Sequence, residues 1–327
     1  MTRRKNKLKP YHGVILLILA AVDIFFAGDY LVRQFGYYGT LFAELILLFL
    51  SVGVVFVFGG DLKKVFPIRR PKAHQVFGTL VLWFGTLLTT MIVTMVIMII
   101  FPKEMTEVSE GISSSIMHIP FLAAFVVVAV SPAICEEAVF RGVFFNSLFK
   151  PERSKWFTIL VTAAVFGAFH GSIWRFFPTF FLGIAMGYVL METGNMFYNV
   201  LLHGVNNFFS LFAAWMLKFM TGTEGTYGAD DVGRLMEQSD ALLQMPVYLL
   251  GQYLVFYGGS GLLLIYLGDY LIHKGQPGYD KGLFPKEKRR TLFVLVTVSV
   301  GCAVIGIVLM AAGIATKGRS GLRWMKN

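Results

Sequence analysis

Residues 121–149 read FLAAFVVVAVSPAICEEAVFRGVFFNSLF, an apolar stretch with two adjacent glutamates and an arginine in its interior. About 20 apolar residues in succession are enough for a helix to cross a bilayer, so this stretch predicts a transmembrane helix. A charged side chain deep in such a helix costs a few kcal/mol or more, which makes each one a candidate functional residue. The stretch therefore predicts both a membrane fold and the place where its chemistry lies.

Apolar stretches of similar length recur along the whole chain of 327 residues, of which 56% are hydrophobic and only 15% are charged. So little charge cannot cover the surface of a water-soluble protein. We predict an all-α fold, a polytopic membrane helix bundle with about eight or nine transmembrane helices. The predicted spans are 12–32, 38–60, 76–101, 121–149, 157–172, 176–193, 195–220, 246–272 and 291–315, with ends that shift by a few residues.

The distribution of charge predicts how these spans are oriented. Basic residues cluster in the connections 61–75 and 273–290, which the positive-inside rule places in the cytoplasm, and the acidic loop 221–245 falls on the other side. The net charge of +10 is explained by this orientation, so the lipid bilayer is the expected partner and nucleic acid is not. The basic tail after 315 disagrees with the alternation, which makes 157–172 the first segment to suspect of not crossing fully.

No internal repeat or linker divides the sequence, and we predict a single membrane domain over 1–327.

Helical spacing sorts the charged residues of the fourth span. Glu137 and Arg141 are four residues apart and share a face, so the arginine is expected to neutralise Glu137. Glu136 points away from Arg141 and has no local counter-charge. A carboxylate in such a low-dielectric place holds a proton more tightly than in water, which suits a general base near neutral pH. Pro132 removes one backbone hydrogen bond just before it and predicts a kink beside the carboxylates.

Two further spans carry polar groups. His203 and Asn207 are four residues apart, and both can donate hydrogen bonds to an oxygen that becomes negative during acyl transfer. His170 is expected to orient Glu136 or to share a proton with it. A base, a proton partner and oxyanion donors are the groups needed for attack of water on a peptide bond. Structural histidines and a packing salt bridge are the alternative interpretation, but three such elements on three neighbouring spans favour function.

Other polar groups are expected to be structural. They sit alone or near the ends of spans: Asp23, Asp29, Glu44 and Asp269. Cys135 has apolar and acidic neighbours, which keep a thiol protonated, so it is not expected to act as a nucleophile.

Three stretches resemble the motifs EExxxR, FxxxH and HxxxN of the CAAX protease and bacteriocin-processing family, which are intramembrane proteases that include the type II CAAX prenyl endopeptidases. The stretches are 136–141, 166–170 and 203–207. They occur in this order on predicted membrane helices without departure at the defining positions. The resemblance covers about 121–210, which we take as the catalytic core.

The resemblance implies roles for individual residues. Glu136 and His170 would activate a water molecule, and His203 with Asn207 would form the oxyanion site, supported by Glu137 and Arg141. Two mechanisms fit. In one, no metal takes part and Glu136 is the base. In the other, Glu136, His170 and His203 hold Zn²⁺ with water in the open position. Since no HExxH pair fixes two ligands on one helix, we favour the scheme that needs no cofactor.

The sequence thus predicts an intramembrane endopeptidase that hydrolyses a peptide bond in a membrane-attached peptide or protein, in a bacterial cytoplasmic membrane. One alternative is a catalytically silent membrane binding or immunity protein on the same scaffold. Another is a proton-coupled transporter that uses Asp23, Glu44 and Asp269, although the half-to-half repeat of such carriers is missing. We also predict a water-filled cavity that reaches Glu136 from the cytoplasm, with 157–172 not crossing as an ordinary helix so that His170 can meet Glu136.

Overall fold

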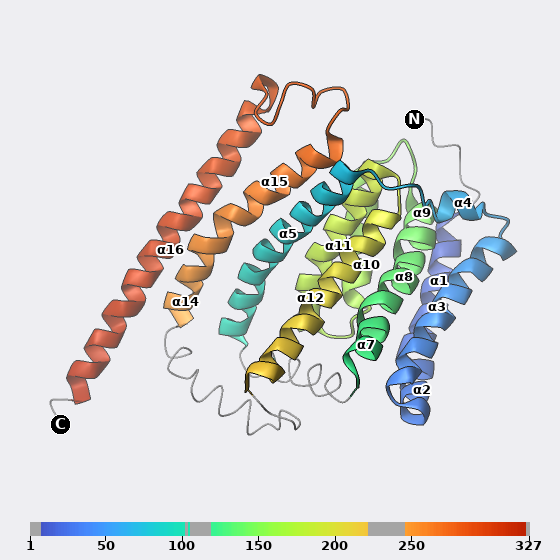
Figure 1. Ribbon diagram of the computed structural model, residues 1–327, viewed down its shortest axis with the longest axis horizontal. Coiled ribbons are helices and arrows are strands. Elements are labelled where there is room, and N and C mark those ends of the chain that lie inside the picture. The colour runs from blue at the N-terminus through green and yellow to red at the C-terminus, as the bar shows by residue number, and fades with distance from the viewer. Residues whose placement is uncertain (1–7, 102–103, 105–118, 222–245, 325–327) are drawn as a thin grey trace. The chain divides into compact units, whose positions relative to one another are not determined.

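The computed structural model describes residues 8–101, 104, 119–221 and 246–324, and every regular element in these ranges is a helix (Figure 1). Seven of the described helices are long and apolar enough to cross a membrane. The chain is therefore a multi-pass integral membrane protein with an all-α fold, as the composition predicted. Residues 222–245 lie outside the described ranges, so the expected side of the acidic loop stays a prediction.

Each of the nine predicted spans corresponds to one helix or to one continuous helical run. Several runs contain a π-helical turn, labelled η. The elements are α1 (Pro10–Val22), η1 (Asp23–Ala27), α2 (Gly28–Phe35), α3 (Tyr37–Val57), α4 (Leu62–Val65), α5 (Ala73–Ile100), α7 (Phe121–Ala124), η2 (Phe125–Val130), α8 (Ser131–Glu137), η3 (Ala138–Phe144), α9 (Phe145–Leu148), α10 (Lys155–Ala168), α11 (Ile173–Thr193), α12 (Phe197–Thr221), α14 (Pro246–Tyr253), η4 (Leu254–Gly258), α15 (Gly259–His273), the 3₁₀ turn η5 (Lys286–Lys288) and α16 (Arg289–Trp324).

The chain forms two compact units. The first comprises Met1–Thr79 with Ile116–Gly222, and the second comprises Leu80–Ser115 with Thr223–Asn327. In the second unit, glycines let helices approach closely, since a Cβ added to Gly251 would lie 2.6 Å from the carbonyl oxygen of Gly306. This division into two units does not test the predicted single membrane domain over 1–327, which stays a prediction.

The helical run α7–α9 lies at the centre of the first unit, where it packs against α1, α3 and α12 (Figure 1). Half of its most apolar stretch is buried, a larger share than in any other described span. Ionisable groups on this run are therefore covered by neighbouring helices on several sides. The charged motif of the fourth span is built into the best-covered helix of the unit.

Helices α10 and α11 form a tight antiparallel hairpin beside this run. A Cβ on Gly183 would meet Ala163 at 3.0 Å, so glycine is what permits the close approach. Lys155 and Glu192 form an ion pair of 2.6 Å at the open end of the hairpin. At the closed end, Gly171 adopts a φ of +65°. The predicted span 157–172 is thus a 14-residue helix of about 21 Å, which ends before His170 because the glycine turn begins there.

The basic connections of the first unit gather at one end of its helices. The side chain of Asn195, at the start of α12, accepts a hydrogen bond from the backbone N–H of Arg69 and donates one to its carbonyl, at 3.0 and 3.1 Å. The hydroxyl of Tyr198 accepts from the backbone N–H of Lys72 at 2.8 Å. The segment that precedes α5 is therefore fixed to the start of α12, which accords with one cytoplasmic face for these basic residues.

Candidate active site

Glu137 and Arg141 form a fully buried ion pair. Arg141 Nη1 lies 2.9 Å from Glu137 Oε1, and neither side chain is exposed. Arg141 Nη2 also donates to the carbonyl oxygen of Gly183 in α11 at 3.3 Å. Two charges out of water are tolerated only when they are paired and hydrogen-bonded, and both conditions are met here. The four-residue spacing predicted this pair.

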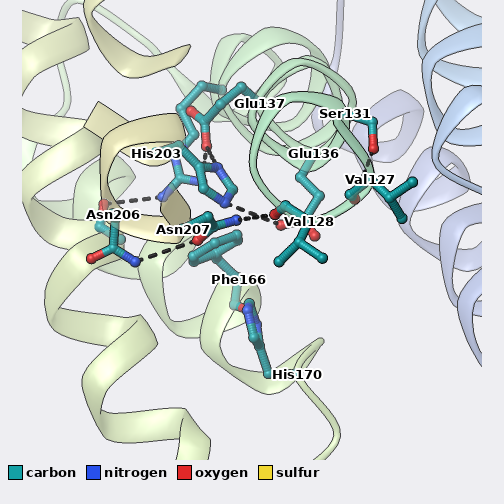
Figure 2. A network of polar contacts seen from close by, with 12 residues as sticks. Val127, Val128, Ser131, Glu136, Glu137, Phe166, His170, His203, Asn206 and Asn207 are labelled. Carbon is teal, nitrogen blue, oxygen red and sulfur yellow. Dashed lines mark hydrogen bonds and ion pairs between the residues drawn. The ribbon is translucent and has the colours of Figure 1, made fainter. Parts of the chain in front are cut away.

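His203 lies between the two glutamates (Figure 2). Its Nδ1 is 3.1 Å from Oε1 of Glu137, and its Nε2 is 3.9 Å from Oε2 of Glu136. Since the ionised Glu137 can only accept, Nδ1 must carry the proton of this hydrogen bond. The Glu136 side chain remains 21% exposed, whereas that of Glu137 is fully buried. Of the two carboxylates, Glu136 is therefore the one with room beside it for a water molecule.

Asn207 compensates for the proline in the neighbouring helix. Pro132 has no N–H, so the carbonyl four residues earlier, that of Val128, loses its usual helical donor. The side-chain amide of Asn207 donates to this carbonyl at 3.1 Å (Figure 2). Ser131 Oγ donates to the adjacent carbonyl of Val127 at 3.0 Å. The irregular turn before Glu136 is thus stabilised by side chains, one of which belongs to the predicted oxyanion site.

His170 lies apart from this group. Its Nδ1 donates to the carbonyl oxygen of Phe166 at 2.9 Å, and within the described residues no hydrogen bond or ion pair joins it to Glu136. The ring of Phe166 contacts both imidazoles edge-on, with centroids 4.9 Å from His170 and 5.8 Å from His203. The structure brings Glu136, Glu137 and His203 together and leaves His170 one aromatic ring away (Figure 2). We predicted from the sequence that His170 meets Glu136 and that a water-filled cavity reaches Glu136 from the cytoplasm. Both stay predictions.

The zinc alternative can be tested on the arrangement of the donors. In the part of the chain that the structure describes, no three His, Cys, Asp or Glu side chains are grouped as metal ligands would be. Glu136, His170 and His203 as placed therefore do not form the Zn²⁺ site of the second mechanism.

Sequence reasoning overlooked a polar stripe on α12. Asn199, His203 and Asn207 follow one another at intervals of four and so lie on one face of α12, and Asn195 continues this spacing just before the helix begins at Phe197. Asn199 is fully buried and donates to the carbonyl oxygen of Met186 in α11 at 2.7 Å. The repeat of polar residues at every fourth position would have revealed this stripe from the sequence. The stripe ties α12 to α11, to the α7–α9 run and to the loop before α5.

The acidic residues expected to be structural behave in three ways. Asp23 and Glu44 are 3% and 8% exposed, and neither oxygen of Asp23 has a hydrogen-bond partner among the described residues. Asp29 pairs with Arg33 at the surface, at 2.8 Å. Asp269 lies 3.0 Å from His273 Nδ1 near the end of α15.

The fold and the buried polar cluster define a multi-pass membrane protein with ionisable groups at the centre of its helices. Residues 118–209 match one family model, described as Type II CAAX prenyl endopeptidase Rce1-like. This segment contains all three motifs, so the match supports their resemblance to the CAAX protease and bacteriocin-processing family. No curated protein and no solved structure matches the chain. The family supports an intramembrane protease function in general, with the bilayer as surroundings and a peptide or protein as substrate.

Proposed function

We propose that the chain is an intramembrane endopeptidase in which Glu136 activates a water molecule to hydrolyse a peptide bond of a membrane-attached peptide or protein. The observation that supports this most is that the two adjacent glutamates have different environments. Glu137 forms an ion pair with Arg141, whereas Glu136 has no such pair with Arg141 and remains partly exposed beside His203. We further propose that the protein acts in a bacterial cytoplasmic membrane.

In the proposed reaction, Glu136 accepts a proton from water while the water oxygen attacks the carbonyl carbon of the scissile bond. The electrons of the C=O bond move onto its oxygen, which becomes the oxyanion. When the tetrahedral intermediate collapses, the C–N bond breaks and the proton on Glu136 passes to the leaving amine. The products are a carboxylic acid and an amine, so the step requires no metal or other cofactor.

His203 and Asn207 are the proposed oxyanion donors. Glu137 accepts from Nδ1 of His203 and so turns Nε2 toward Glu136, from where a protonated His203 can donate to the oxyanion. The amide of Asn207 carries a second N–H besides the one on Val128. His170 would join Glu136 when substrate closes the site, since catalytic hydrogen bonds often tighten only in the substrate complex.

The test is a cleavage assay of purified protein against a panel of membrane-anchored peptides, with products identified by mass spectrometry. The parent should cleave at least one peptide with or without a chelator, and Glu136→Gln should lower the rate by about 10² to 10⁴. Loss of activity with chelator alone would favour the metal mechanism. A parent that binds peptides without cleaving any would be a silent binding protein on this scaffold.

A further inference from the structure

Arg175 is a cation inside the first unit that the mechanism above does not use. It lies in the first turn of α11, directly after the tight turn that carries His170, and its side chain is part-buried. An arginine within a membrane helix is costly unless it is paired or serves a site. Its surroundings should therefore show what it serves.

In the part of the chain that the structure describes, Arg175 has no ion-pair partner. Within the described residues, no carboxylate lies within 4.0 Å of its guanidinium, and no hydrogen bond to its side chain is present. By contrast, Arg141 pairs with Glu137, and Arg33 pairs with Asp29. Arg175 thus stands out as a part-buried cation whose five N–H donors are available to an anion.

The register of the helices places Arg175 beside the proposed active site. The contact of Arg141 with the carbonyl of Gly183 aligns the α7–α9 run with α11, and the two run in the same direction. Glu136 precedes Arg141 by five residues and Arg175 precedes Gly183 by eight, so the two differ in height by about 5 Å. An arginine side chain spans such a distance. The tight turn just before α11 carries His170, five residues before Arg175.

We propose that Arg175 is a specificity-determining residue that binds a carboxylate of the peptide substrate, next to the bond that Glu136 hydrolyses. The inference rests on the proposed endopeptidase function. A peptide carries carboxylates only at its carboxyl terminus and on Asp or Glu side chains, so these are the anions that a peptide can offer. The planar guanidinium binds a carboxylate through two parallel hydrogen bonds, a geometry that lysine cannot reproduce.

The first test compares three versions of one cleaved peptide: a free acid, the carboxyl-terminal amide, and an amide with an internal aspartate near the scissile bond. For the parent, amidation should raise KM by about 10-fold to 100-fold, as expected for loss of a charge-assisted hydrogen bond. Recovery of KM with the internal aspartate would show that a side-chain carboxylate can replace the terminus, and no recovery would show that only the terminal carboxylate is bound. In Arg175→Gln the acid and the amide should have equal KM, and Arg175→Lys should recover only part of the difference.

The second test measures binding instead of cleavage. The acid and the amide are titrated against Glu136→Gln protein in nanodiscs of zwitterionic lipid, with and without Arg175→Gln. The preference for the acid should vanish with Arg175→Gln and persist with Arg153→Gln, a control at the other end of the hairpin whose guanidinium stacks on Phe157. Binding needs no turnover, so it tests the site even if the catalytic proposal fails.

Two results would overturn the inference. Equal binding of acid and amide by the protein with Arg175 intact would show that no peptide carboxylate is recognised. A response to Arg175→Gln that appears only in anionic lipid would assign the residue to a lipid phosphate instead. If the parent cleaves no peptide but still prefers the acid through Arg175, the proposed function fails and this inference stands.

Discussion

At the scale of the residue, two neighbouring glutamates with the same chemistry have different environments. One step along a helix turns a side chain by about 100°, which carries Glu137 into the ion pair with Arg141 and leaves Glu136 open beside His203. Breaking a buried ion pair by removing one partner costs about 3 to 5 kcal/mol, because the other charge stays behind. This pair is the reason why we propose a supporting role for Glu137.

Asp23 offers a contrast, because its buried oxygens have no hydrogen-bond partner within the described ranges. Asp23→Asn strands no opposite charge, so we expect the free energy of unfolding to change by less than about 1 kcal/mol or to rise. Thermal unfolding in detergent measures this, with Asp29→Asn as a surface control. A loss of more than about 2 kcal/mol would show that Asp23 has a stabilising partner.

Part of the site was predictable from spacing alone. Residues four apart on one helix share a face, so the Glu137–Arg141 pair followed from the sequence. The hydrogen bond between His203 and Glu137 did not, because it depends on which faces of α12 and α8 meet. Arg175 escaped notice for the same reason, since its proposed place beside Glu136 follows from the contact of Arg141 with Gly183 in α11.

At the scale of the element, the helix that carries the glutamates is interrupted and then repaired. Pro132 frees the carbonyl of Val128, and Asn207 satisfies it from α12. One side chain thus compensates for a missing backbone donor and holds two helices in register. The interruption lies one turn from Glu136, where it helps to set the direction of that side chain.

We predict that Asn207→Ala lowers the free energy of unfolding by about 1 to 3 kcal/mol, because a buried carbonyl loses its donor. In a Pro132→Ala background, the loss should be smaller, since the restored backbone N–H can serve Val128. Unfolding of both single variants and the double variant forms a double-mutant cycle. Additive losses would contradict the compensation.

Helix positions were predictable because lipid demands long apolar runs, and each of the nine predicted spans falls on a helical run, although α16 continues to Trp324, nine residues beyond the predicted end at 315. The π-helical turns, such as η2 and η3, were not predictable. They depend on neighbouring helices that accept the extra bulge, and apolar composition carries no such information.

At the scale of the whole molecule, topology remains the main expectation from charge. The basic connections 61–75 and 273–290 are predicted to face the cytoplasm, and the turn between α2 and α3 is predicted to face the other side. The connections 61–75 and 273–290 lie on the same side only if an even number of helices crosses the membrane between them. This condition is met when the short helix α10 counts as a crossing.

Labelling with a membrane-impermeant thiol reagent tests the orientation at exposed positions. In a background with Cys135 and Cys302 replaced by alanine, Arg70→Cys and Lys274→Cys should be labelled only from the cytoplasm. Gln34→Cys should be labelled only from the opposite side. Labelling of Gln34→Cys and Arg70→Cys from the same side would mean that α3 does not cross.

The most direct test of the catalytic proposal compares Glu136→Gln with Glu137→Gln in the same preparation, by cleavage rate and by unfolding temperature. We predict that Glu136→Gln lowers the rate by a factor of about 10² or more at an unchanged unfolding temperature, because only the base is lost. Glu137→Gln should lower the unfolding temperature, because it strands Arg141. A stable, inactive Glu137→Gln together with an active Glu136→Gln would contradict the account and exchange the two roles.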